Sequence, residues 1–99
     1  MNGSLRILLV DDDPDARALV MRELGREFPQ RQFRLVTDLN GLILAIRSGP
    51  WDLVVTEHRL RWGDGLTVLA AVKDRWPDCP VIMFTGSGNE VIADRKSVV

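Results

Sequence analysis

Four short segments that are typical of strands alternate along the chain with segments that have the periodicity of a helix. The run Leu5 to Val10 is continuous and apolar, which is typical of a strand covered on both faces in a parallel sheet. Three more strands are expected at Gln32 to Thr37, Asp52 to Thr56 and Pro80 to Phe84. Because short connections between alternating strands and helices favour right-handed crossovers, we expect an α/β fold with helices on both faces of one parallel sheet.

Helices are expected between these strands, and each follows an aspartate that can cap it. The three capping residues are Asp13, Asp38 and Asp64. The first helix should run from about Pro14 to Phe28, the second should end at Ser48-Gly49-Pro50, and the third must end before Pro77. Only Asn89 to Val99 remains after the fourth strand, so we expect a short helix or a frayed tail there.

Size and charge indicate one domain over residues 1–99, without a strong overall field. A chain of 99 residues with 45% hydrophobic content can bury one modest core. Its formal net charge of -1 steers it toward neither nucleic acid nor membrane. No apolar run is long enough to span a bilayer, and the N-terminus lacks a signal pattern. We therefore expect a cytoplasmic protein with no direct nucleic-acid or membrane partner.

Polar side chains follow three of the expected strands. Asp11-Asp12-Asp13 ends the first strand, Glu57 ends the third and Thr85 ends the fourth. Ligands of open parallel sheets bind beyond these carboxyl ends, so we expect the three groups to meet at one edge. Gathered carboxylates either raise a pKa or recruit a cation, and an oxygen-rich site of this kind suits Mg²⁺. Asp13 is explained by capping, whereas Asp11 and Asp12 are candidate metal ligands.

Four segments, in this order and spacing, resemble the receiver domain of two-component response regulators. They are Val10-Asp11-Asp12-Asp13-Pro14, the strand Asp52 to Val55, Leu60 with Asp64-Gly65-Leu66, and Phe84-Thr85-Gly86. The resemblance implies a flavodoxin-like (βα) three-layer sandwich with strand order 2-1-3-4. It also implies that paired acids hold Mg²⁺, and that a histidine kinase transfers phosphoryl to an aspartate ending the third strand.

The resemblance also assigns roles to single positions of this sequence. Asp11 and Asp12 match the acid pair, and Glu57 occupies the phosphoacceptor position and joins the metal ligands. Arg59 matches the residue whose backbone carbonyl assists the metal. Thr85 matches the hydroxyl that reports phosphorylation.

The chain departs from the family pattern at three places. Glu57 stands where the family has aspartate, and Arg61 replaces the usual proline of the following loop. The chain also ends before the strand that would carry the family's lysine, and Lys96 lies too soon after Thr85 to replace it. We therefore expect a C-terminally truncated receiver that lacks the last strand and helix. The edge this exposes suggests a homodimer, formed through that edge or through the face of the fourth strand.

Glutamate at position 57 has one methylene more than aspartate, and phosphoryl transfer tolerates little displacement. We therefore expect a pseudo-receiver that is not an enzyme and acts through protein–protein interaction, with weak or no phosphorylation. Two alternatives remain open: a working receiver phosphorylated at Glu57, and a fragment of a haloacid dehalogenase-type phosphohydrolase, suggested by Asp11-x-Asp13 and Thr85. We also expect His58 to face solvent, while Trp62 either anchors a partner or packs over its own loop.

Overall fold

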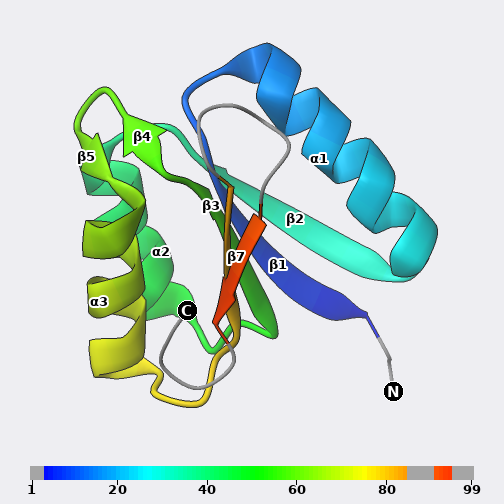
Figure 1. Cartoon of the computed structure of the whole chain (residues 1–99). Coiled ribbons are helices and arrows are strands. Elements are labelled where there is room, and N and C mark those ends of the chain that lie inside the picture. The colour runs from blue at the N-terminus through cyan, green and yellow to red at the C-terminus, as the bar shows by residue number, and fades with distance from the viewer. Residues whose placement is uncertain (1–3, 85–90, 95–99) are drawn as a thin grey trace.

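The computed structural model describes residues 4–84 and 91–94 and contains one large sheet between helices (Figure 1). Its elements in chain order are β1 (Leu5–Val10), α1 (Pro14–Glu27), β2 (Arg31–Val36), α2 (Leu39–Ser48), β3 (Leu53–Glu57), β4 (Arg59–Leu60), β5 (Gly63–Asp64), α3 (Gly65–Arg75), β6 (Val81–Phe84) and β7 (Val91–Asp94). The four strands expected from the sequence are β1, β2, β3 and β6. No helix in this part of the chain is long and apolar enough to cross a membrane.

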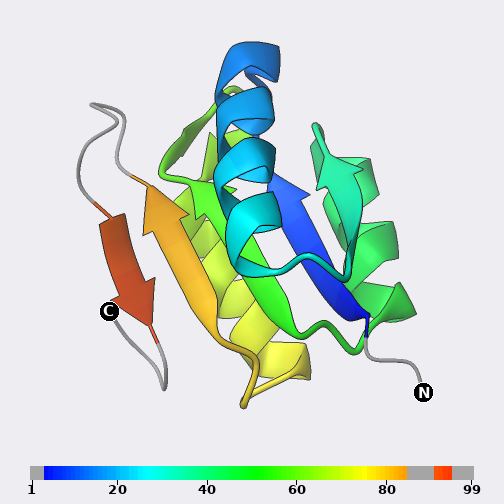
Figure 2. The same ribbon diagram turned by 90° about the vertical axis from the view of Figure 1, so that its right-hand side faces the viewer.

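The large sheet has the strand order β2-β1-β3-β6-β7, and its first four strands are parallel. The expected order of the four parallel strands is therefore confirmed. Helix α1 lies on one face of the sheet, and α2 and α3 lie on the other (Figures 1 and 2). On the side of α1, the described elements leave β6 and β7 without a covering helix (Figure 2).

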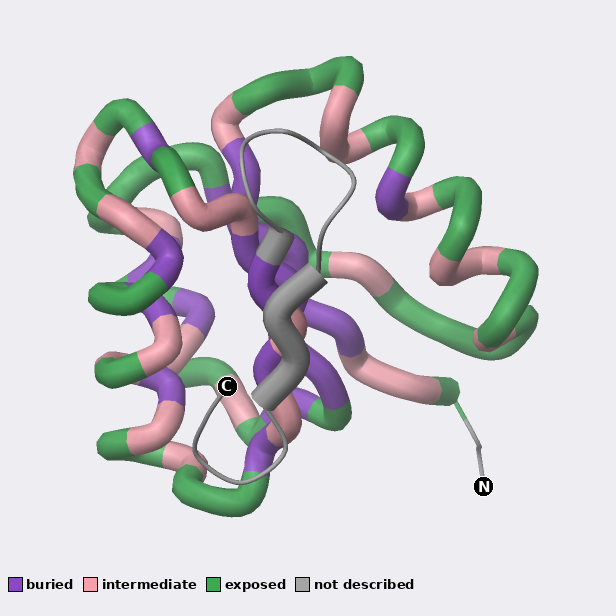
Figure 3. The backbone as a smooth tube through the Cα atoms, in the orientation of Figure 1, coloured by how far each residue is buried: buried purple, intermediate pink, exposed green. Residues whose placement is uncertain are grey.

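Two clusters of buried side chains form the core, one on each face of the sheet. Ile7 and Leu9 of β1 belong to the cluster under α1, whereas Leu8 and Val10 belong to the cluster under α2 and α3. This alternation explains why β1 is apolar at every position, since side chains of a strand point to opposite faces. The buried positions accordingly concentrate on the central strands (Figure 3).

Each of the three helices begins after the aspartate that the sequence suggested. Asp13 accepts a hydrogen bond from the Asp15 backbone N–H at 3.0 Å, and Asp38 accepts one from Gly41 at 2.7 Å. Asp64 accepts from both the backbone N–H and the hydroxyl of Thr67, at 2.8 and 2.9 Å. Such a cap stabilises a helix by about 1 kcal/mol, because it satisfies a backbone donor that the helix leaves free.

The expectation of a helix or a frayed tail after the fourth strand is wrong for residues 91–94. They form β7, which pairs antiparallel with β6 and places Val91 opposite Phe84 and Asp94 opposite Val81. An open edge of β6 would present unpaired backbone groups, and the β-branched Val91 and Ile92 favour a strand. The exposed edge expected at the fourth strand is therefore covered by the chain itself, and the described sheet ends at β2 and β7.

The segment after β3 was expected to be a loop, and it contains a small antiparallel pair. Leu60 of β4 lies opposite Gly63 of β5, and the Gly65 backbone N–H donates to the His58 carbonyl at 2.7 Å. A side chain at Gly65 has no room. A Cβ there would lie 2.8 Å from the Glu57 carbonyl oxygen and 2.9 Å from the Met83 sulfur. The start of α3 therefore packs directly against the end of β3, which fixes the backbone at Glu57.

Replacing this glycine should weaken the fold. We expect Gly65→Ala to lower the free energy of unfolding by about 1–3 kcal/mol, because the added methyl group overpacks a site bounded by backbone atoms. Gly63→Ala is the matched control, since a Cβ at Gly63 meets no atom within 4 Å. It should change the free energy by no more than about 0.5 kcal/mol. Urea unfolding measures both, and equal losses in the two variants would contradict the packing argument.

Candidate functional site

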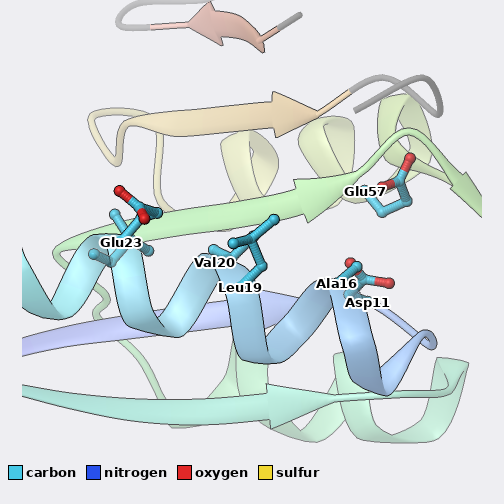
Figure 4. Close-up of a pocket in the computed structure, with 7 residues that line it drawn as sticks. Asp11, Ala16, Leu19, Val20, Glu23 and Glu57 are labelled. Atoms are coloured by element: carbon cyan, nitrogen blue, oxygen red, sulfur yellow. The ribbon is translucent and has the colours of Figure 1, made fainter. Parts of the chain in front are cut away.

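The carboxyl ends of β1 and β3 bring two acidic side chains to the same edge of the sheet. Val10 of β1 pairs with Thr56 of β3, so the next residues along the two strands, Asp11 and Glu57, leave the sheet together. Both line one pocket, where Figure 4 shows them at the same end. Their proximity is also electrostatic, because the charge of Asp11 contributes to raising the pKa of Glu57.

Asp11 is a buried carboxylate with only 2% of its surface exposed. Its Oδ1 accepts a hydrogen bond from the Asp13 backbone N–H at 2.9 Å, and its main-chain oxygen accepts one from the Arg17 guanidinium at 2.9 Å. Burial raises its pKa, and the charges of Asp13 and Asp12 raise it further. The hydrogen bond from Asp13 and the charge of Arg17 act in the opposite direction without cancelling the shift.

Glu57 is the least satisfied acid of the site. Its Oε2 is buried and has no hydrogen-bond partner among the described residues. Burial is the main cause that raises its pKa, and the neighbouring charge of Asp11 adds to it, whereas the backbone amides of Arg59 and His58 lower it. A buried carboxylate oxygen without a partner needs a proton, a water molecule or a cation.

Asp12 lies half-buried beside this pair, and a different segment holds it. Its Oδ2 accepts a hydrogen bond of 2.7 Å from the Arg61 backbone N–H, across 49 positions of the sequence. This amide is a part of the site that sequence reasoning missed. The sequence does show that residue 61 is not proline and therefore has a backbone N–H to donate. Nothing in the sequence places that N–H near Asp12.

The other predicted residues have mixed outcomes. Arg59 is exposed and pairs with Asp64 in the small sheet, and Thr85 lies outside the described residues. The expectation that His58 faces solvent is wrong, because it is half-buried and its Nδ1 is a buried atom. The position follows from the tight packing of Gly65 against the His58 backbone. Trp62 is partly buried and packs against the core, which favours the second of its two interpretations.

The pocket that holds Asp11 and Glu57 extends away from them along α1. It has a volume of about 400 Å³, and apart from these two acids it is lined by Ala16, Leu19, Val20, Glu23 and Leu24. In Figure 4 Leu19 and Val20 lie in the middle of the pocket. Glu23 lies at the end opposite Asp11 and Glu57. The sequence did not predict this apolar extension, in which Leu19 is 51% exposed.

The acidic side chains fit Mg²⁺ in their chemistry. Within the described residues, no three His, Cys, Asp or Glu side chains form a ready metal-binding group. Mg²⁺ needs only one or two carboxylates, because it keeps several waters. The buried, unpartnered oxygen of Glu57 beside Asp11 is a ligand of the required kind. The residues present therefore fit a magnesium site that water completes.

Known proteins resemble this chain in sequence and structure. The response regulator receiver domain family matches residues 7–97. The response regulator protein PilR of Pseudomonas aeruginosa is 36% identical over 85 residues, which cover 85% of this chain and 18% of PilR. NtrX from Brucella abortus, solved in complex with ADP, is 34% identical with a TM-score of 0.73, over 87% of this chain and 20% of that one.

A third similar protein has been solved in complex with Mg²⁺ and BeF. The response regulator TrrA of Thermotoga maritima, in complex with Mg²⁺ and BeF, is 28% identical with a TM-score of 0.70. The match covers 82% of this chain and 69% of the TrrA chain. Our chain spans less than a fifth of the length of PilR, so the activity of that whole protein is not transferred to it. The family match covers nearly the whole sequence, and the chain therefore belongs to the response regulator receiver domain family.

Proposed function

We propose that this receiver domain is a pseudo-receiver, which signals through protein–protein contacts and is phosphorylated weakly or not at all at Glu57. The observation that carries the proposal is the state of the Glu57 carboxylate, whose Oε2 is buried and without a partner. A phosphoacceptor oxygen must reach the phosphorus in line with the leaving group, and small displacements cost much of the rate. A longer side chain that buries its oxygen is poorly placed for this attack.

The same site supports a proposal for Mg²⁺. Asp11, Asp12 and Glu57, with the backbone carbonyl of Arg59, would hold the ion. The positive ion would offset the electrostatic repulsion between the carboxylates of Asp11 and Glu57. The chain's own contribution is orientation, since the Asp13 backbone N–H fixes one oxygen of Asp11 and the Arg61 backbone N–H fixes one oxygen of Asp12.

The partners we propose follow from the family and from the open part of the sheet. Receiver domains exchange signals with histidine kinases and other signalling proteins, and we propose such a partner in the cytoplasm, with no direct contact to nucleic acid. The face of β6 and β7 beside α1 carries no helix among the described elements (Figure 2), and Ile82 of β6 is only partly buried there. This face is also where we propose a homodimer would form.

Two alternatives differ in how well they are supported. A working receiver phosphorylated at Glu57 keeps the same pocket and differs only in the reactivity of one carboxylate. The phosphohydrolase fragment has no support from the family match, which accounts for the segments around Asp11 and Glu57 together. Phosphorylation of the native chain would therefore favour the first alternative.

Incubation with a phosphodonor distinguishes a pseudo-receiver from a working receiver. We expect the native chain to gain no phosphoryl group after incubation with Mg²⁺ and acetyl phosphate, whereas Glu57→Asp gains one. The shorter side chain should withdraw the carboxylate to the distance at which a phosphoryl group fits. Intact-mass spectrometry measures both proteins under the same conditions. A phosphoryl group that maps to Glu57 in the native chain would refute the pseudo-receiver proposal.

The raised pKa of Glu57 leads to a prediction for stability. The folded pKa lies above the ordinary value of 4.5, so the folded state loses stability relative to the unfolded one as the pH rises from about 4.5 through the folded pKa. Without metal, we expect Glu57→Gln to be more stable than the native chain at neutral pH. This advantage should shrink as the pH falls through the folded pKa, and it should be gone below about 4.5.

Urea unfolding in the presence of a chelator, at neutral and at acidic pH, measures this difference. Saturating Mg²⁺ should reverse the order at neutral pH, because an ion that binds only the folded state stabilises the protein that still has its ligand. Glu27→Gln, at the exposed end of α1, serves as the control and should respond to neither condition. A Glu57→Gln protein that is less stable than the native chain at neutral pH without metal would contradict the argument.

A further inference from the structure

The backbone amide of Arg61 joins two segments that are far apart in the sequence. Its N–H donates to Oδ2 of Asp12 at 2.7 Å, across 49 positions. We propose that this amide is a positioning group, which orients the Asp12 carboxylate so that its other oxygen faces a bound Mg²⁺. The inference rests on the proposed metal site and adds to it a residue that the family resemblance does not assign to the site.

The length and type of this hydrogen bond suit a positioning role. A backbone N–H that donates to a carboxylate forms a charge-assisted bond, which is shorter and stronger than a bond between neutral groups. It occupies one oxygen of Asp12, and the other accepts no hydrogen bond from the described part of the chain. Asp11 is held in the same way, because the Asp13 backbone N–H occupies its Oδ1 at 2.9 Å. Asp11 and Asp12 are thus each held by one backbone amide.

The small sheet holds the Arg61 amide in place. Leu60, the preceding residue, is buried and pairs with Gly63, and Trp62, the following residue, packs against the core. The amide therefore lies between two anchored residues and does not depend on its own side chain, which is exposed. A donor held in this way orients its acceptor without ordering a flexible group each time an ion binds. Groups that orient metal ligands typically change metal affinity by 10–100-fold when they are lost.

The identity of residue 61 matters through its backbone. Proline, which the resemblance implies at this position in the family, has no N–H to donate. Any other residue keeps the donor, so a change to proline and a change to alanine separate the amide from the guanidinium. Proline should also fit the local backbone. The residue before it, Leu60, lies in a strand, which is the conformation that a residue preceding proline prefers. Arg61 itself does not have a positive φ, which proline could not adopt.

The test compares Arg61→Pro with Arg61→Ala in a titration with MgCl₂. Two-dimensional NMR of ¹⁵N-labelled protein follows the Trp62 indole and the nearby backbone amides, and it gives the Mg²⁺ dissociation constant of each protein. We expect Arg61→Pro to weaken Mg²⁺ binding about tenfold or more, as for other losses of orienting groups. Arg61→Ala should bind like the native chain. Equal affinity in the native and proline proteins, or an equal loss in both variants, would overturn the proposal.

A second readout distinguishes failure of this inference from failure of the metal site. Hydrogen exchange at the Arg61 amide should be slow in the native chain and fast in Asp12→Ala. It should remain slow in Asp15→Ala, which removes an exposed aspartate from the same turn. If the native chain shows no Mg²⁺-induced shift although this amide is protected, the metal site is refuted. If Mg²⁺ binds while the amide is unprotected, only the positioning role is refuted.

Discussion

The pairing of β1 with β3 fixes the position of two buried acids, and the site depends on that register. Val10 lies opposite Thr56, so Asp11 and Glu57 leave the sheet at the same level. Both acids are removed from water, and burial is the largest cause of the rise in each pKa. A receiver domain without a bound cation therefore keeps two carboxylates in a medium that disfavours their charge. This electrostatic cost makes the edge of the sheet a candidate site for a cation.

Backbone amides limit this cost, and the charge of Arg17 helps at Asp11. Glu23, on the exposed surface of α1, forms ion pairs with Arg22 and Arg26. Asp11 and Asp12 each accept one main-chain N–H. Glu57, which lines the pocket beside α1, has no such bond to its Oε2 among the described residues.

Much of this arrangement could be predicted from the sequence, because it depends on local patterns. Strand β1 has the predicted bounds, and all three capping aspartates act as expected. The buried side of α3 does not follow from hydrophobicity alone, since Leu66 is 58% exposed whereas Val68 and Val72 are buried. Strand β7 depends on a tertiary contact, because it pairs with the edge of β6. The burial of His58 depends on another, because Gly65 packs against its backbone. The Arg61 amide leaves no side-chain pattern at all, so only the structure could place it beside Asp12.

We propose that the pocket binds a cation while Glu57 resists the phosphoryl group. A crystal structure of the native chain with Mn²⁺ and beryllofluoride tests both parts at once, because anomalous scattering locates the metal and the density shows any adduct. We predict an anomalous peak bounded by Asp11, Asp12 and Glu57, with no beryllofluoride attached to the glutamate. A beryllofluoride adduct on Glu57, or the lack of a metal peak beside Asp11, would contradict the account.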